Sequence, residues 1–422
     1  MTSSDRLDAV RRTVLNFYLR SAADESFNGI HAASPRLAIA AEGQLVECIR
    51  TLIEDRSIDS IWDINPHIKR FPEAAPDKQL ARIDQLSLAD ACLYPSRKTL
   101  AGVVGPEDFR DKPFSRALLL GEAQLSFVPF EMAVLQRYRN DPRYRLVFTD
   151  YMGDTYISDD FYKKDRTLDR DHIGVQSFGL GFDSEGLPHI IAFYRYLASM
   201  TPEHQQYWRS FVSEERVRMS EPYFQSSIVG DWWENRSVRF AVAEEMRLIN
   251  ELAESKWGGR VFREEMDENL TLDLTAFLVP SSEAFGQLAH TWDKLLSDNI
   301  EKRFFDGKVS LTSETEISPG RFRVTDKGTL TLLEEWLLTV STGSAEVDAI
   351  LKPLRKVRKL RQKPAHTFSK NSFSRDFHAH RIELLKEIHT AVKTLRRVLA
   401  DSSEDHGIDI PSWLDTDEVH FF

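Results

Sequence analysis

The chain has 422 residues, of which 41% are hydrophobic and 29% are charged, and its formal net charge at pH 7 is −11. This length exceeds the size of one hydrophobic core, so we expect two or three domains, and the composition excludes a mainly disordered protein. Only Cys48 and Cys92 are present, which argues against a disulfide framework and a cysteine-based zinc site. There is no apolar run of membrane-spanning length and no signal-peptide pattern, so we expect a cytoplasmic protein without a membrane partner.

The N-terminal half is predicted to combine helices with a small sheet. Apolar residues at helical spacing predict a helix over residues 4–20 and another around residues 45–53. Residues 63–115 are rich in proline and charge, which indicates irregular surface structure with short helices. A helix is expected over residues 130–139, ended by Asn140-Asp141-Pro142. Strands are predicted at residues 145–149, 173–178 and 189–194, and the turn at Gly186-Leu-Pro188 should pair the last two as a hairpin.

The middle of the chain has a helical pattern. Thr201-Pro202 is a typical helix start, with Thr as the N-cap and Pro in the first turn. Helices are expected at residues 202–212, 237–257, 281–305 and 330–340. We therefore expect an α+β protein with four parts: an N-terminal α+β domain (1–195), a helical middle domain (196–341), a basic helical module (345–400) and an acidic tail (401–422).

Two amphipathic helices are expected near the C-terminus. The first covers residues 346–361, where Pro353 should kink the helix or restart it, and the second covers residues 376–399. Pro364 breaks the chain between them, so they should fold back as an antiparallel pair. The tail that follows has seven acidic residues and no Lys or Arg. It is either disordered with an aromatic hook or folded back over the basic helices.

This helical pair carries the positive charge of the chain. Between Lys352 and Ala400 there are 14 Lys or Arg residues and three acidic ones, in a chain that is otherwise strongly acidic. Such a run is either a solvated helix face or an edge that contacts phosphates and releases their counterions. The candidate nucleic-acid contacts are Lys352, Arg355, Lys356, Arg358, Lys359 and Lys363.

A short motif lies where the first helix should end, in Arg361-Gln-Lys-Pro-Ala-His366. Residues 345–400 thereby resemble HEPN domains, small helical bundles of prokaryotic toxins and defence nucleases that carry an Arg-x4-6-His signature. Active members are metal-independent RNases in which two copies of the motif meet across a dimer. The resemblance implies that Arg361 steadies the scissile phosphate and that His366 acts as general acid or base, with the 2′-hydroxyl as nucleophile and no cofactor.

The motif departs from the family pattern at Gln362 and at Pro364, which lies inside it. In the structural alternative, Arg361 caps the carbonyl groups at the helix end and His366 is a loop residue. The leading functional hypothesis is therefore metal-independent RNA cleavage of toxin or phage-defence type by a homodimer joined through the C-terminal helices. The alternatives are a non-catalytic subunit of a bacterial defence or regulatory system that binds nucleic acid or a partner protein, and a structural scaffold.

Other parts of the sequence carry weaker signals. Most of residues 115–400 also resembles an uncharacterised group of large bacterial proteins, through the phrases beginning at Leu120, Val134, Thr201 and Leu360. Arginines between Val134 and Tyr144 alternate with tyrosines, which suits either RNA or pairing with Asp141 and Asp150. His378 and His380 would point apart on a helix, so no metal site is expected.

Overall fold

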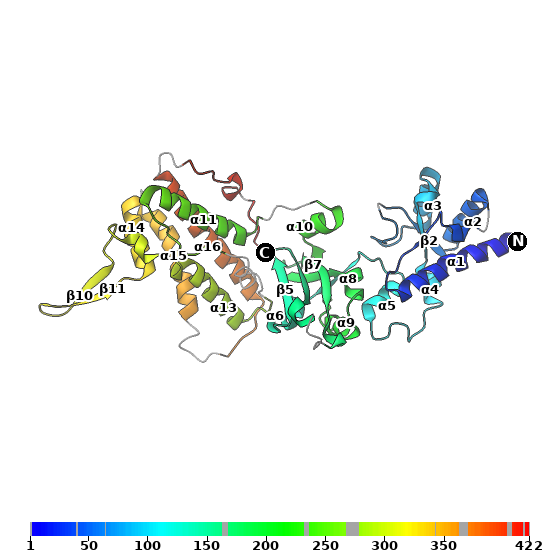
Figure 1. The fold of residues 1–422 in the computed structure, drawn as a ribbon, viewed down its shortest axis with the longest axis horizontal. Helices are drawn as coiled ribbons and strands as arrows, with labels where there is room; N and C mark the ends of the chain where they lie inside the picture. Colours follow the sequence, from blue (N-terminus) through cyan, green and yellow to red (C-terminus); the bar gives the residue numbers. More distant parts are fainter. Residues whose placement is uncertain are drawn as a thin grey trace. The chain divides into compact units, whose positions relative to one another are not determined.

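The computed structural model describes residues 2–38, 41–63, 65–162, 168–231, 236–266, 278–341, 343–362, 370–402, 407–416 and 418–421. Helices account for 52% and strands for 16%, so the chain is a mixed α+β protein, as the sequence predicted (Figure 1). It divides into two compact units. Unit 1 comprises Met1–Val147 and Met152–Tyr223, and unit 2 comprises Phe148–Tyr151 and Phe224–Phe422.

The N-terminal part of unit 1 packs helices on a three-stranded antiparallel sheet. The first helix begins with a capping box, in which the hydroxyl of Thr2 accepts from the Asp5 amide and the Asp5 carboxylate accepts from the Thr2 amide. The sheet has the order β1-β3-β2. The elements are α1 (Ser3–Ala23), β1 (Ile30–His31), α2 (Glu42–Glu54), β2 (Ile58–Ile61), α3 (Pro76–Gln85), β3 (Cys92–Pro95), α4 (Arg97–Ala101) and α5 (Pro113–Leu119).

The rest of unit 1 is built on a larger sheet with the order β4-β8-β7-β6-β5, and β9 pairs with β7. The expected hairpin is present: β7 and β8 are antiparallel, and Gly186 has a φ of +78° in the turn between them. The strands are β4 (Phe127–Phe130), β5 (Tyr144–Thr149), β6 (Met152–Ile157), β7 (Gly174–Phe182), β8 (Pro188–Phe193) and β9 (Arg218–Met219). The helices are α6 (Gln136–Asn140), α7 (Asp159–Tyr162), α8 (Tyr194–Ala198), α9 (Pro202–Arg209) and α10 (Glu221–Phe224), whose last residue is counted in unit 2.

Unit 2 is mainly a helical bundle around one hydrophobic core. Its long helices are α11 (Val238–Trp257), α13 (Ser282–Asp293), α14 (Thr329–Val340), α15 (Ser344–Gln362) and α16 (Asp376–Asp401). All five contribute buried side chains to the same cluster, for example Ile249, Trp292, Trp336, Ile350 and Ile388. A two-stranded hairpin, β10 (Thr312–Ser318) and β11 (Arg321–Asp326), projects from this unit (Figure 1).

The units differ from the expected domains in two places. Residues 196–223 belong with the sheet of unit 1, since β9 pairs with β7 and α9 packs against α5. Helices α15 and α16 share the core of α11, α13 and α14. Residues 345–400 therefore do not stand apart from the middle helices. Pro353 lies inside α15 as a helical residue.

Several local predictions also differ from the structure. The expected helix over residues 130–139 is instead the end of β4, a 3₁₀ turn at Met132–Leu135 and the short α6. The expected helix over residues 281–305 is split into α13, a π-helical turn at Lys294–Asp298 and a 3₁₀ turn at Lys302–Phe305. No helix in the described part of the chain combines the length and the apolar character that crossing a membrane requires.

The acidic tail folds back onto unit 2. Leu414 is fully buried in the shared core, and a parallel bridge joins His420 to Ser237. The Asp415 carboxylate accepts hydrogen bonds from Arg396 and Arg397 on α16. Burial opposes ionisation of Asp415, but these two arginines outweigh it and lower the pKa of the carboxyl group. The contacts of the described tail residues thus reach α16, the second of the two expected helices.

Candidate nucleic-acid interface on α15

The basic residues of α15 separate into two sets according to the helical period. Lys352, Arg355, Lys356 and Lys359 are exposed. Lys352 and Lys359 each lie three or four residues from both Arg355 and Lys356, so the four form one face of the helix, here called the outer stripe. Arg358 and Arg361 are half-buried and are directed towards α13. The six described basic residues of α15 therefore do not form one continuous surface.

The inner pair is held by two aspartates. The Arg361 guanidinium donates to the Asp293 carboxylate at 2.7 Å and also to Asp298. The Arg358 guanidinium donates to Asp298 at 3.0 Å and lies 3.4 Å from Asp293. The Asp293 side chain is 0% exposed, so it depends on these two cations for its charge compensation. The four side chains form a closed cluster, here called the Arg–Asp square, that fastens the end of α15 to α13.

The π-helical turn explains why both aspartates can reach the same partners. Asp293 ends α13 and Asp298 ends the π turn that follows. In an α-helix, residues five apart point about 140° away from each other. A π turn bonds residues five apart, which brings them onto one side. Arg358 and Arg361 are three residues apart on α15, so they also share a side and meet the two carboxylates together.

The square leaves Arg361 with little capacity for a ligand. Hydrogen bonds to Asp298 and then to Asp293 raise the pKa of Arg361, so the guanidinium keeps its charge. That charge is matched by carboxylates at hydrogen-bonding distance, and only 33% of the side chain is exposed. A phosphate approaching Arg361 would have to share it with Asp298, which is 43% exposed. The structural alternative placed Arg361 on the carbonyl groups of its own helix, but the recorded partners lie on a different segment.

The outer stripe is more available to a ligand. Arg355 pairs with Glu334 at 2.6 Å and Lys356 pairs with Glu387 at 2.8 Å. Both pairs lie on the surface, where such contacts contribute only about 0–1 kcal/mol. Lys352 and Lys359 are exposed and have no ionic partner among the described residues. An incoming polyanion can therefore use all four cations without disturbing the core.

Two of the predicted site residues cannot be placed. His366 and Lys363 lie outside the described residues, as does Pro364, because the described part of α15 ends at Gln362. The pairing of Arg361 with His366, which the HEPN resemblance implies, therefore stays a prediction.

Three described histidines near the predicted motif, His378, His380 and His389, lie on α16. The ring of His380 packs beside Phe285 and Phe377. Burial lowers the pKa of His389 to about 4, so this ring is neutral at pH 7. Among the described residues, no group of three or more His, Cys, Asp or Glu side chains could hold a metal ion.

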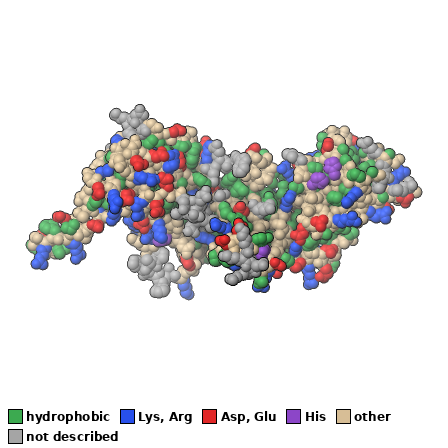
Figure 2. Space-filling model, viewed as in Figure 1, with side chains coloured by type: hydrophobic (Ala, Val, Ile, Leu, Met, Phe, Trp, Pro, Cys, Tyr) green, Lys and Arg blue, Asp and Glu red, His purple; other side chains and the backbone are tan. Residues whose placement is uncertain are grey.

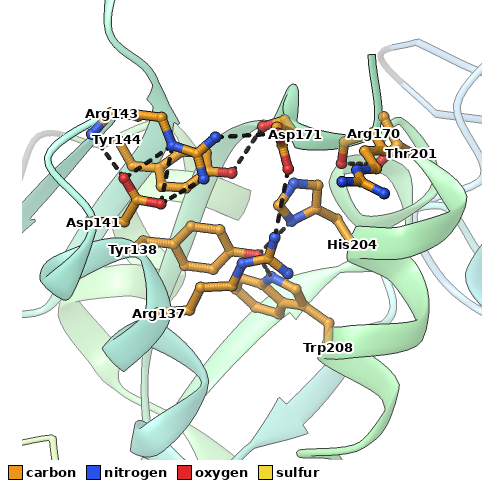
Figure 3. Close-up of polar contacts among 10 residues, drawn as sticks. All are labelled: Arg137, Tyr138, Asp141, Arg143, Tyr144, Arg170, Asp171, Thr201, His204 and Trp208. Atoms are coloured by element: carbon orange, nitrogen blue, oxygen red, sulfur yellow. Dashed lines mark hydrogen bonds and ion pairs between the residues drawn. The ribbon is translucent and has the colours of Figure 1, made fainter. Parts of the chain in front are cut away.

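A second polar cluster, which the sequence did not single out as a site, lies in unit 1 (Figure 3). The Tyr138 hydroxyl lies 2.8 Å from Nδ1 of His204 and accepts from the indole of Trp208 at 2.9 Å. All three side chains are buried, and burial together with the charge of Arg137 lowers the pKa of His204 to about 4. A neutral, fully buried imidazole helps to hold α9 against α6 and cannot exchange protons with a substrate.

Arg143, near the rim of this cluster, pairs with two carboxylates, and the sequence analysis expected one of them, Asp141. Arg143 donates to Asp141 at 2.7 Å and to Asp171 at 3.1 Å (Figure 3). Asp150, the other expected partner, pairs with Arg239 instead. This arrangement favours pairing over RNA binding for the segment from Val134 to Tyr144.

Comparison with known protein families, with curated proteins and with solved structures gave no match. The resemblance of residues 345–400 to HEPN domains therefore stays an expectation from the sequence.

Proposed function

We propose that this chain is a non-catalytic RNA-binding protein that holds RNA phosphates on the outer stripe of α15. The observation that supports the proposal is that the basic residues of this helix lie on two separate faces. Four exposed cations form one face, while the inner arginines are already neutralised by Asp293 and Asp298. RNA, rather than nucleic acid in general, is the expected ligand because of the HEPN resemblance.

The energetics favour exchange of the surface partners for phosphates. Glu334 and Glu387 each hold one cation of the stripe through a solvent-exposed pair. Breaking such a pair costs little, whereas each phosphate that is neutralised releases condensed counterions. Affinity should therefore fall steeply with salt. The logarithm of the binding constant should fall by about 0.7 per phosphate contact for each tenfold rise in salt on a single strand.

The test uses anisotropy of a labelled single-stranded RNA with the full-length protein. Lys356→Gln/Lys359→Gln should weaken binding at least about tenfold and reduce the salt slope by about 1.4, because two phosphate contacts are lost. The matched control is Arg11→Gln/Arg12→Gln, which removes the same charge from the exposed side of α1. Equal losses in the two variants would show that only net charge matters, and would overturn the proposal. A DNA strand of the same sequence tests the preference for RNA.

Metal-independent cleavage is the second candidate, and one observation favours it. Arg361 lies in the last turn of α15, partly exposed, next to the segment that contains His366. In this reaction the 2′-oxygen would attack the neighbouring phosphorus while the bond to the 5′-oxygen breaks. His366 would take the proton from the 2′-hydroxyl or give one to the leaving 5′-oxygen.

Incubation of the RNA with excess EDTA separates the two candidates. His366→Ala is the informative variant, because changing Arg361 also breaks the Arg–Asp square. Cleavage that is lost in His366→Ala while binding is retained would support the second candidate. Binding without cleavage by the unmodified chain supports the first.

A further inference from the structure

The hairpin β10–β11 has no buried residue. Every residue of both strands is exposed or half-exposed, and Figures 1 and 2 show the hairpin projecting from unit 2. Its turn is Pro319-Gly320, where Gly320 has a φ of +75°. An isolated two-stranded ribbon is only marginally stable in water. Such a projection is expected to have a partner that stabilises it.

The two faces of the hairpin differ in chemistry. Phe322 and Val324 lie opposite Glu316 and Glu314, so one face combines apolar and acidic side chains. Phe322 and Val324 are each 57% exposed, and Ile317, at the irregular step near the turn, is 59% exposed. The other face carries Arg321 and Arg323 with hydroxyl side chains. Exposed apolar side chains in one small area mark an interaction surface.

A hollow elsewhere on unit 2 is lined by both apolar and charged side chains. This hollow of about 740 Å³ lies between α15 and α16. Ala345, Ala349 and Pro353 recur every four residues on α15 and form an apolar strip in its lining. The cations in the lining are Lys352, Arg355 and Lys386, and the acids are Asp348 and Glu387.

We propose that the β10–β11 hairpin of one copy of this chain docks into the α15–α16 hollow of a second copy, and that the exchange is reciprocal. Phe322 and Val324 would cover the Ala and Pro strip, and Glu314 and Glu316 would face the cations of the hollow. The exposure of the whole hairpin shows that it does not fill the hollow of its own chain. Two identical contacts related by a two-fold axis close a dimer and prevent growth into a fibre.

This inference does not rest on the proposed RNA binding. Lys352 and Arg355 belong both to the outer stripe and to the hollow, so a docked hairpin would cover that end of the stripe. Lys356 and Lys359 do not line the hollow and remain free for RNA. The two proposals can therefore fail separately: Lys356→Gln/Lys359→Gln should leave the dimer intact.

The oligomeric state of the full-length chain is the test, measured by sedimentation over a range of concentrations. Phe322→Ser/Val324→Ser should raise the dimer dissociation constant at least about tenfold. At concentrations where both chains are monomeric the melting temperature should not change, because neither side chain is buried in its own chain. The matched control, Arg321→Ser/Arg323→Ser, alters the opposite face and should leave the dimer unchanged. A loss of dimer that is equal in the two variants would overturn the inference.

A mixing experiment tests the receptor. Ala349→Glu places a carboxylate in the hollow where Glu314 and Glu316 are expected, and should also give a monomer. The hairpin variant mixed with Ala349→Glu should form a heterodimer, since one intact hairpin and one intact hollow remain. Absence of that heterodimer overturns the inference. An unmodified chain that stays monomeric at every concentration also overturns the inference. If Arg321→Ser/Arg323→Ser then loses RNA affinity, the hairpin binds nucleic acid instead.

Discussion

Position on the helix decides what each basic residue of α15 does. Arg358 and Arg361 look like the rest of the run in the sequence, but they bind carboxylates of α13 and of the π turn. The helical period could have divided the run into two faces. It could not have shown that the inner face meets Asp293 and Asp298, because those contacts span 68 and 63 residues and depend on an irregular π turn. The sequence thus predicted the helix that carries these residues, but not which of them already have carboxylate partners.

The Arg–Asp square predicts an asymmetry between its two aspartates. Asp293→Asn should lower the free energy of unfolding by about 2 kcal/mol, because two cations lose a buried counter-charge. Asp298→Asn should cost only about 0.5 kcal/mol, since its side chain is 43% exposed and water screens it. Urea unfolding of the two variants, which make the same chemical change, measures the difference. If both substitutions lowered the free energy of unfolding equally, Asp293 would not be the buried counter-charge of the two arginines.

His204 predicts a pH dependence of stability. The pKa of His204 in the folded chain is lowered to about 4. Its imidazole therefore stays neutral at pH values where the same side chain in the unfolded state, with a pKa near 6.5, takes up a proton. This contribution is complete above about pH 7 and is lost as the pH falls towards 4. Between pH 7 and pH 5 this loss should lower the free energy of unfolding by about 2 kcal/mol.

His204→Gln keeps a polar group beside Tyr138 but has no titration in this window. It should be less stable than the unmodified chain at pH 7 and should show a shallower decline towards pH 5. Urea unfolding followed in unit 1 at several pH values gives the slope of the free energy of unfolding against pH for each of the two proteins. Parallel slopes would mean that the imidazole is protonated in the folded chain as well.

At the level of elements, regular segments were predictable and irregular ones were not. The helix of residues 237–257 and the hairpin at Gly186 were expected and are present, since period and turn chemistry are local signals. The hairpin β10–β11 was missed although Ser318-Pro-Gly320 is a good turn, because no buried face gives its strands an apolar alternation. Its existence therefore has to be explained by something other than the core of unit 2.

Two glycines test whether that hairpin is independent of the core. Gly320 and Gly258 have φ angles of +75° and +71°, and a Cβ at either meets no atom within 4 Å. Alanine at each position therefore introduces the same backbone strain, about 1 kcal/mol. Gly258→Ala should lower global stability by that amount, because Gly258 caps α11.

Gly320→Ala should leave the urea midpoint of the monomeric chain unchanged. Only the amides of β10 and β11 should exchange faster with solvent, since the hairpin can open without opening the bundle. Hydrogen exchange of both variants at low protein concentration makes the comparison. A drop in global stability for Gly320→Ala would show that the hairpin is part of the cooperative unit.

At the scale of the whole molecule, unit 2 depends on a short segment far upstream. Asp150, in Phe148–Tyr151, pairs with Arg239 of α11 at 3.3 Å, and both side chains are almost fully buried. Burial lowers the pKa of Arg381, on α16, to about 10, and Asp150 is the charge that opposes this shift. Sequence reasoning assigned Asp150 to the N-terminal domain, because no local pattern announces a partner about ninety residues away. Charge balance inside the bundle therefore joins segments that the chain order separates.

Asp150→Asn tests this dependence in the full-length chain. The substitution keeps the shape of the side chain but leaves two buried guanidinium groups without a carboxylate. Breaking a buried pair in this way should cost about 3–5 kcal/mol. The loss should appear in hydrogen exchange of α11 and α16, while α1 keeps its protection. Arg239→Met added to Asp150→Asn removes one of the stranded charges and should recover part of the stability. A double variant no more stable than Asp150→Asn alone would mean that Arg239 does not need the carboxylate.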